Sequence, residues 1–156
     1  MNILVSAALL LLIMGVYDGA VYRLPDFLTL PFLLLTAVFA PPEPDLRIAG
    51  MVLACSILWI TASLFRRVRG FPGLGFGDVK LAAGCGALIG VQQVGLMLLL
   101  ASSLALVILL DLAGSRRLAD ATVSWGQVAK RPIALGPFLA GSTLLIAYAQ
   151  VKGLLS

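Results

Sequence analysis

The sequence predicts an all-α integral membrane protein, a polytopic bundle of six transmembrane helices. Of its 156 residues, 61% are hydrophobic and 12% are charged, whereas soluble domains average about 45–50% and about 25%. The mean hydropathy is +1.08, and long charge-free stretches follow one another along the chain. A water-soluble fold of this length could not bury so much apolar surface. We therefore expect one transmembrane domain, residues 1–156, embedded in the lipid bilayer.

Five charge-free stretches are candidates for membrane spans, each of which needs about 20 mostly apolar residues. They are Met1–Tyr17, Phe27–Pro42, Ile48–Phe65, Leu81–Leu110 and Pro132–Val151. The fourth stretch would be about 45 Å long as a helix, against a hydrocarbon core of about 30 Å. It is therefore either one steeply tilted helix or two short helices that meet at GVQQVG, residues 90–95.

The distribution of basic residues favours two helices in that stretch. Six spans then lie roughly at residues 1–17, 27–42, 48–65, 79–91, 94–113 and 132–151. Nine of the eleven basic residues fall on one side of the membrane, and only Arg47 and Lys152 fall on the other. With a single helix the division would be six against five. The positive-inside rule thus predicts a protein of the cytoplasmic membrane with both termini outside the cytoplasm.

Two connections are expected to lack regular structure. The segment APPEPDLR, residues 40–47, is rich in proline and acidic residues, which is typical of a stiff turn on the external side. It contains Glu43 and Asp45. The segment 114–131 is the longest polar stretch, and we expect it to be a cytoplasmic loop.

Composition argues against several kinds of site and partner. The chain has no histidine, and its two cysteines, Cys55 and Cys85, are far apart within apolar stretches. This pattern argues against a zinc site or a disulfide framework, so we expect no metal and no cofactor. The net charge is +4, but no basic run exceeds two consecutive residues. Nucleic acid is therefore not an expected partner.

Three carboxylates stand at the cytoplasmic ends of predicted spans: Asp18, Asp26 and Asp78. A charged carboxylate near the hydrocarbon is costly, so such residues usually have a partner or a task. Two carboxyl groups at one depth can meet in a bundle, where one holds a proton while the other acts as a base. Such a pair can activate water against a peptide carbonyl. The alternative is two separate ion pairs, Asp18 with Arg23 and Asp78 with Lys80.

The segment GLGFGDVKL, residues 73–81, places three glycines just before Asp78. Glycine leaves the backbone unobstructed and able to adopt conformations that other residues avoid. An extended substrate chain could then lie close to the carboxylate. The glycines alone are weak evidence, but together with a second carboxylate at matching depth they favour a peptidase.

Several of these segments resemble motifs of one family, the type IV prepilin peptidases, which are membrane-embedded aspartic proteases. GFGDVKL, residues 75–81, resembles their Gly-X-Gly-Asp-X-Lys signature. DGAVYRLPDFLTLP, residues 18–31, resembles the first half of their site, an Asp at the end of span one followed by a segment ending in Leu-Pro-Asp. IALGPFLAG, residues 133–141, and GCGALIG, residues 84–90, resemble their Gly-Pro-containing last span and their glycine-bearing helix after the second Asp.

The resemblance implies an aspartic endopeptidase of the type IV pilus system. Its substrate would be a prepilin, in which a short basic leader precedes a hydrophobic helix, cleaved at the cytoplasmic face of the membrane. By the same resemblance, Asp18 and Asp78 are the catalytic pair. The supporting residues that the motifs imply are Gly75, Gly77, Lys80, Arg23, Pro25 and Asp26.

Larger members of that family carry an extra cytoplasmic domain with paired Cys-X-X-Cys motifs and an N-methyltransferase activity. This sequence has no such insertion, so the resemblance implies a compact, peptidase-only form like those that serve tight-adherence (Flp) pili. Archaeal preflagellin peptidases share the same pair of aspartates and remain an alternative.

Other classes of function remain open from the residues. One is another membrane aspartic protease, although the RLPD and LGPF matches favour a prepilin peptidase. A small transporter or channel subunit would place carboxylates near the middle of the bilayer, whereas these lie at span ends. A non-catalytic scaffold would not need the pair. The sequence does not indicate an oligomeric state. It also does not indicate which member of the pair is protonated, because coupled carboxyls titrate as a unit.

Overall fold

The computed structural model describes residues 2–21, 26–40, 43–69, 75–119 and 135–154, and the regular structure in these ranges is entirely helical. This confirms the predicted all-α class. The helices, in chain order, are α1 (Asn2–Val21), α2 (Asp26–Phe39), α3 (Pro44–Arg69), α4 (Phe76–Ile89), the 3₁₀ helix η1 (Val91–Gln93), α5 (Val94–Ala119) and α7 (Gly136–Val151).

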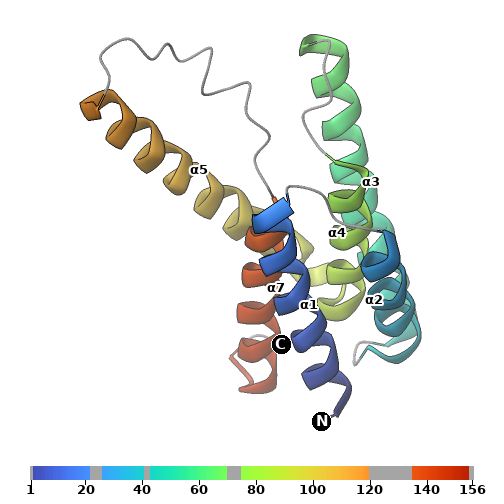
Figure 1. Cartoon of the computed structure of the whole chain (residues 1–156). Helices are drawn as coiled ribbons and strands as arrows, with labels where there is room; N and C mark the ends of the chain where they lie inside the picture. The colour runs from blue at the N-terminus through green and yellow to red at the C-terminus, as the bar shows by residue number, and fades with distance from the viewer. Residues whose placement is uncertain (1, 22–25, 41–42, 70–74, 120–134, 155–156) are drawn as a thin grey trace.

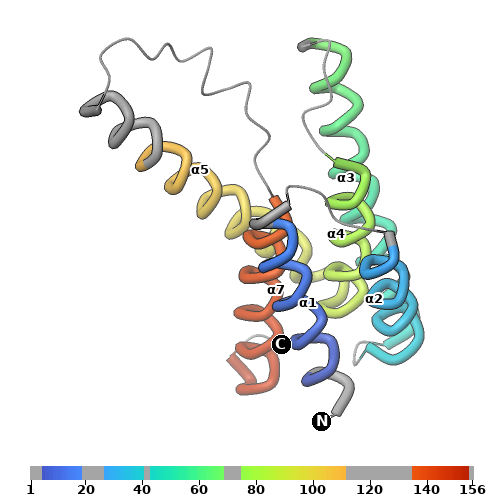
Figure 2. Tube along the Cα trace, viewed as in Figure 1, coloured from blue at the N-terminus to red at the C-terminus, as the bar shows by residue number. Residues whose placement is uncertain are grey.

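The helices run alternately in opposite directions, as Figure 1 shows. The end of α1, the end of α3, the start of α4 and the start of α7 therefore lie toward one side. Both chain termini lie on the opposite side (Figure 1). Helix α5 starts within the bundle and leans away from it toward its C-terminal end, a feature also clear in the trace of Figure 2.

Helix α4 occupies the centre of the bundle and packs against α2, α3 and α7. From Asp78 to Ile89 every residue except Lys80 is buried. Most of these residues are small, which lets neighbouring helices approach closely, as is common in membrane bundles. Gly86 of α4 faces Gly50 of α3, and a Cβ on either would overlap the carbonyl oxygen of the other. The sequence thus allows backbone contact between α3 and α4.

The chain breaks between α4 and α5 at Gly90, which has φ 80° and ψ 163°. That conformation is essentially restricted to glycine. The 3₁₀ turn follows, and the side-chain amide of Gln150 on α7 donates to the carbonyl of Ile89 at 2.9 Å. The interpretation of residues 81–110 as two helices is confirmed; that each crosses the membrane stays a prediction.

The expected external turn at residues 40–47 is shorter than predicted, because α3 already begins at Pro44. Proline suits the first helical position, and Asp45 in the first turn interacts favourably with the helix dipole. Asp45 is therefore a helical residue rather than a turn residue. The Arg47 guanidinium donates to the carbonyl oxygens of Ala37 at 3.0 Å and Val38 at 2.6 Å, which satisfies acceptors in the last turn of α2.

The polar segment 114–131 also differs from the expected loop. Helix α5 continues to Ala119, past the predicted end at 113, so the first part of this segment is helical. Residues 120–134 lie outside the described residues. Helix α7 begins at Gly136 rather than at 132, and Pro137 suits its first turn.

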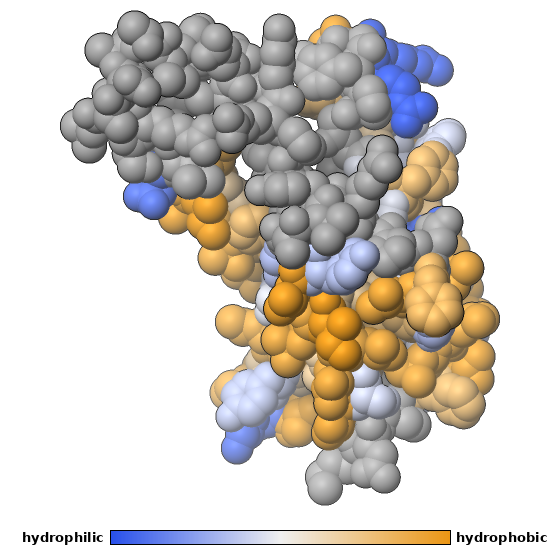
Figure 3. All heavy atoms as spheres, in the orientation of Figure 1, coloured by the Kyte–Doolittle hydropathy of each residue, from blue (hydrophilic) through white to orange (hydrophobic). Residues whose placement is uncertain are grey.

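Two helical stretches are long and apolar enough to cross a membrane, Pro44–Val68 and Val91–Asp111. Only 17% of the most apolar window of each is buried, so these helices present their apolar side chains outward rather than to a core. Among the residues that are coloured in Figure 3, hydrophobic side chains also dominate. The other apolar helical stretches in the described residues are shorter: Val5–Asp18, Phe27–Phe39 and Gly136–Val151. The bundle of six spans therefore stays a prediction.

Candidate active site

Asp18 lies in the last turn of α1, and only 3% of its surface is exposed. Its carboxylate oxygen Oδ2 accepts a hydrogen bond of 3.0 Å from the backbone N–H of Gly136, the first residue of α7. The two residues are 118 positions apart in the sequence. The contact therefore ties the end of α1 to the start of the last helix.

Asp78 is the third residue of α4 and is 8% exposed. Its backbone N–H donates to the carbonyl of Gly75 at 3.2 Å, while its carboxylate accepts a hydrogen bond from the backbone of Gly75. This pairing resembles half of a capping box, in which an acidic third residue reaches back to the N-cap N–H. Gly75 is extended, with φ −74° and ψ 146°, and it fixes the side chain at the helix start.

The structure brings the carboxyls of Asp18 and Asp78 close enough to interact electrostatically. Asp78 precedes the predicted span 79–91, and its pKa is raised above the ordinary carboxyl value, first by burial and then by the charge of Asp18. The hydrogen bond from Gly75 lowers the pKa, but by less. A like charge that acts on a buried neighbour makes it hard for both groups to ionise together.

Helices α2 and α7 set the spacing of the two carboxyls. Each of them packs against both α1, which carries Asp18, and α4, which carries Asp78. The small residues on α4 permit this close packing: the ring of Phe32 on α2 lies directly against Gly84, and a Cβ there would come within 2.6 Å of its Cε1. The pair is thus held by helix packing rather than by a flexible loop.

The other residues singled out by sequence fall into two groups. Gly77 and Lys80 are half-buried near the start of α4, beside Asp78. Arg23 and Pro25 lie outside the described residues, and Asp26 begins α2, where only the backbone is described. The proposed ion pair between Asp18 and Arg23 therefore also lies outside them.

The chemistry available at this site is that of two neighbouring carboxyl groups. One protonated and one ionised carboxyl can donate and accept protons in the same step, which suits the attack of water on a carbonyl group. Within the part of the chain that the structure describes, no three His, Cys, Asp or Glu residues gather as a set that could hold a metal ion.

Sequence reasoning did not identify the contribution of Gly136. It noted the LGPF segment only as a matching motif, without a role at the site. A signal was present, however: a glycine directly before a proline at the start of an apolar helix leaves a backbone N–H available there. Nothing in the local sequence indicated that the acceptor would be Asp18.

Residues 5–110 match the model of the type IV leader peptidase family. The chain belongs to the type IV leader peptidase family. The matching segment covers more than half of the chain and includes both Asp18 and Asp78, whereas Gly136 lies beyond it. The family resemblance inferred from the sequence motifs is therefore confirmed.

Several curated relatives are called prepilin leader peptidase/N-methyltransferase. The protein of Dickeya chrysanthemi is 32% identical over 146 residues, which is 87% of this chain and 46% of the relative. That of Pseudomonas aeruginosa is 34% identical over 136 residues, 83% of this chain and 43% of the relative. That of Klebsiella pneumoniae is 37% identical over 102 residues, 62% of this chain and 44% of the relative.

The chain spans less than half the length of these curated relatives. No solved structure shows significant similarity to it.

Proposed function

We propose that this chain is an aspartic endopeptidase that cleaves the leader peptide from type IV prepilins. The observation that carries the proposal is the pairing of two buried carboxyls, in which the charge of Asp18 acts on Asp78. Membership of the leader peptidase family supports the class of reaction. The names of the relatives support a prepilin as the substrate.

The proposed reaction is general acid–base hydrolysis without a covalent intermediate. The ionised carboxyl takes a proton from water as the water oxygen attacks the carbonyl carbon of the scissile peptide bond. The protonated carboxyl donates its proton to the carbonyl oxygen. When the tetrahedral intermediate collapses, the C–N bond breaks and the leaving nitrogen takes up the proton that the base had removed from water. The products are a free leader carboxylate and a new N-terminal amine.

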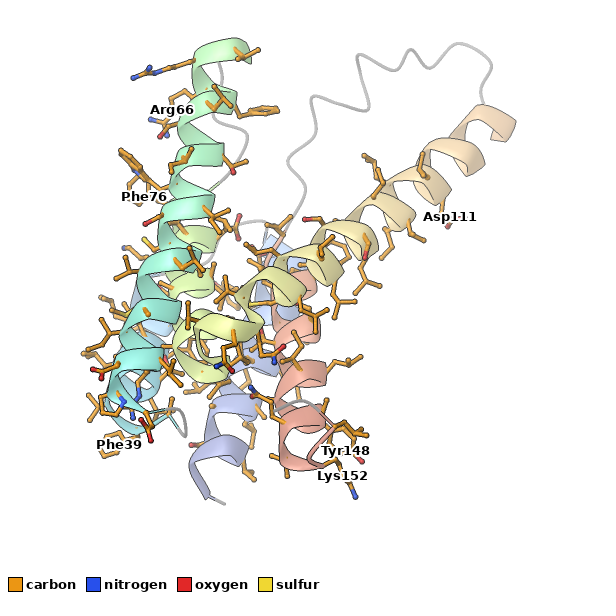
Figure 4. The ribbon with its side chains drawn as sticks, turned by 180° about the vertical axis from the view of Figure 1, so that it is seen from behind. Phe39, Arg66, Phe76, Asp111, Tyr148 and Lys152 are labelled. Atoms are coloured by element: carbon orange, nitrogen blue, oxygen red, sulfur yellow. The ribbon has the colours of Figure 1, made fainter. Side chains whose placement is uncertain are left out.

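The proposed location of this site is the cytoplasmic face of the inner membrane. Arg66 and Arg67, both exposed near the end of α3, share the side of the bundle to which the ends of α1 and α3 point. Figure 4 shows Arg66 and Asp111 toward this side, with Phe39 and Lys152 toward the other. An excess of basic residues marks the cytoplasmic side. The outward apolar faces of α3 and α5 suit a lipid bilayer.

A site at that depth fits the proposed substrate. A prepilin leader is basic and precedes a hydrophobic helix, so its junction with the helix would lie at the cytoplasmic edge of the bilayer. Peptide bonds within a helix are not accessible for cleavage, so the substrate must be extended where it is cut. The exposed backbone at Gly75 would admit such an extended segment beside Asp78. We further propose an Flp-type prepilin as the substrate.

The proposal includes peptide cleavage and omits methyl transfer, although the relatives' names include both activities. Methyl transfer is omitted because the sequence has no Cys-X-X-Cys pair between Asp18 and Asp78. Cys55 and Cys85 lie on different helices, α3 and α4, and both are free thiols.

The experiment is cleavage by the purified full chain in liposomes, with an Flp-type prepilin and a panel of other type IV prepilins as substrates. The mass of each product identifies the bond that is cut. The proposal predicts loss of a leader-sized fragment and no added methyl group. Folded protein that cuts none of the prepilins would contradict it, and a product carrying an extra methyl group would contradict the peptidase-only part.

A further inference from the structure

The hydrogen bonds within the first turn of α7 leave one backbone N–H available to donate to Asp18. The backbone N–H groups of Phe138 and Leu139 both donate to the carbonyl of Leu135, each at 3.1 Å. Pro137 has no N–H to donate. The N-cap residue Leu135 provides no side-chain cap. The N–H of Gly136 is therefore the donor that α7 has available, and it donates to the Asp18 carboxylate at 3.0 Å.

The same contact explains why residue 136 is a glycine. A Cβ at this position would overlap Oδ2 of Asp18 and would lie 3.0 Å from its Cγ and 3.2 Å from its Cβ. These atoms belong to a buried side chain at the end of a packed helix, so they have little room to move. Gly141, on the same helix, has no atoms within 4 Å of its Cβ position.

The two carboxyls of the pair consequently differ in their surroundings. Asp18 receives a buried N–H from the start of α7, where the helix dipole also favours negative charge. Asp78 receives its backbone hydrogen bond from Gly75, which is exposed and whose N–H can also bond water. A buried charge-assisted hydrogen bond is stronger than one in contact with water.

We infer that Gly136 is a positioning residue whose N–H holds Asp18 in its ionised form, so that Asp18 is the base and Asp78 the acid of the pair. This inference rests on the proposed function and adds the assignment of roles to it. Burial raises the pKa of both carboxyls, and the backbone hydrogen bonds from Gly136 and Gly75 lower it. At Asp78 the charge of Asp18 raises the pKa further, which agrees with the assignment.

The ionisable groups around Asp18 are few among the described residues. Asp78 on α4 faces it, and Lys80 is half-buried nearby on the same helix. Tyr148 on α7 and Lys152, which directly follows α7, lie toward the far end of that helix (Figure 4). On α2 the first residue is Asp26, whose side chain is not described.

The test is the pH dependence of kcat and KM for the wild-type chain, Gly136→Ala and the matched control Gly141→Ala, all in liposomes with the same prepilin. A displaced base slows the chemical step. We therefore expect kcat of Gly136→Ala to fall about 10- to 100-fold and KM to change less than about twofold. The acid limb of its profile should move to higher pH, because Asp18 is then harder to ionise. Gly141→Ala should match the wild type.

The outcomes separate this inference from the proposed function. If the wild-type protein cleaves no prepilin, both the proposed function and this inference are contradicted. Active wild type together with a Gly136→Ala variant of unchanged kcat and pH profile overturns the positioning role alone. An equal loss in Gly141→Ala also overturns it.

A second measurement applies even if Gly136→Ala folds poorly. The Tm change caused by Gly136→Ala is compared in the wild-type and Asp18→Ala backgrounds. Asp18→Ala removes the Oδ2 and Cγ atoms that the added Cβ would meet, so the loss in Tm should be much smaller in that background. Equal losses in both backgrounds would show that the contact with Asp18 is not what residue 136 provides.

Discussion

The carboxyl of Asp18 at the end of α1 and the carboxyl of Asp78 at the start of α4 lie close enough for the charge of the first to raise the pKa of the second. Both side chains are buried. Helices α2 and α7 pack against both α1 and α4 and so hold the two groups together. The predictions below follow from this pair and from the packing that supports it.

The activity should depend on pH as expected for a pair of carboxyls that shares one proton. Below the acid limb both groups are protonated and the base is lost; above the basic limb both are ionised and the acid is lost. Because the pKa of Asp78 is raised, the basic limb should lie above the range of an ordinary carboxyl. The measurement is kcat/KM for leader cleavage as a function of pH. A basic limb at the ordinary carboxyl pKa would contradict this electrostatic description.

The same shift predicts that Asp78→Asn stabilises the protein at neutral pH. A carboxyl whose pKa is higher in the folded state binds its proton more tightly there than in the unfolded chain, so its ionisation opposes folding. This cost appears as pH rises from the ordinary carboxyl pKa through the raised value. We expect the Tm of Asp78→Asn to exceed that of the wild type at neutral pH, with the difference shrinking on acidification.

The control for this measurement is Asp45→Asn. Asp45 is exposed in the first turn of α3, where its charge favours the helix. This variant should not raise the Tm. A Tm for Asp78→Asn that falls below the wild-type value at neutral pH and recovers in acid would have the wrong sign.

Gly86→Ala should destabilise the bundle, because the added Cβ would overlap the carbonyl oxygen of Gly50 and come within 2.9 Å of the Ala54 Cβ. Overpacking of this kind costs about 1–3 kcal/mol. Thermal unfolding in detergent measures the effect. The matched control is Gly95→Ala, which has no atoms within 4 Å of its Cβ position and gains helix propensity. Equal Tm values for the two variants would show that the α3–α4 approach does not require Gly86.

The topology can be tested with single cysteines in a Cys55→Ala, Cys85→Ala background. Arg66 and Lys152 lie toward opposite sides of the bundle (Figure 4). We expect a membrane-impermeant thiol reagent to label Lys152→Cys in intact cells and Arg66→Cys only after the membrane is opened. Labelling of both residues from the same side would contradict the proposed orientation.

Much of this architecture could be predicted from composition and charge, because helix length and apolar content are local properties. The break at Gly90 is an example: the positive-inside rule favoured two helices over one in residues 81–110, and the structure has α4 and α5 there. The positions of helix ends were less predictable. Helix α3 begins early because Pro44 and Asp45 favour a helix start, although the same residues also suit a turn.

The two carboxyls of the candidate site could be singled out from the sequence for a similar reason. Asp18 and Asp78 stood out because carboxylates at span ends are costly and need a role. The hydrogen bond from Gly136 could not be predicted, since it joins residues 118 positions apart and depends on how α7 packs against α1. Long-range packing of this kind is not expressed in any local pattern.

The measurement that tests the central claim most directly compares kcat/KM for prepilin cleavage in Asp18→Asn, Asp78→Asn and the double variant, with Asp45→Asn as control. If the two carboxyls act as one unit, each single variant should lose at least about 10³-fold and the double variant no more than the singles. Asp45→Asn should cleave at the wild-type rate. A single variant that keeps wild-type activity, or losses that multiply in the double variant, would contradict a shared catalytic pair.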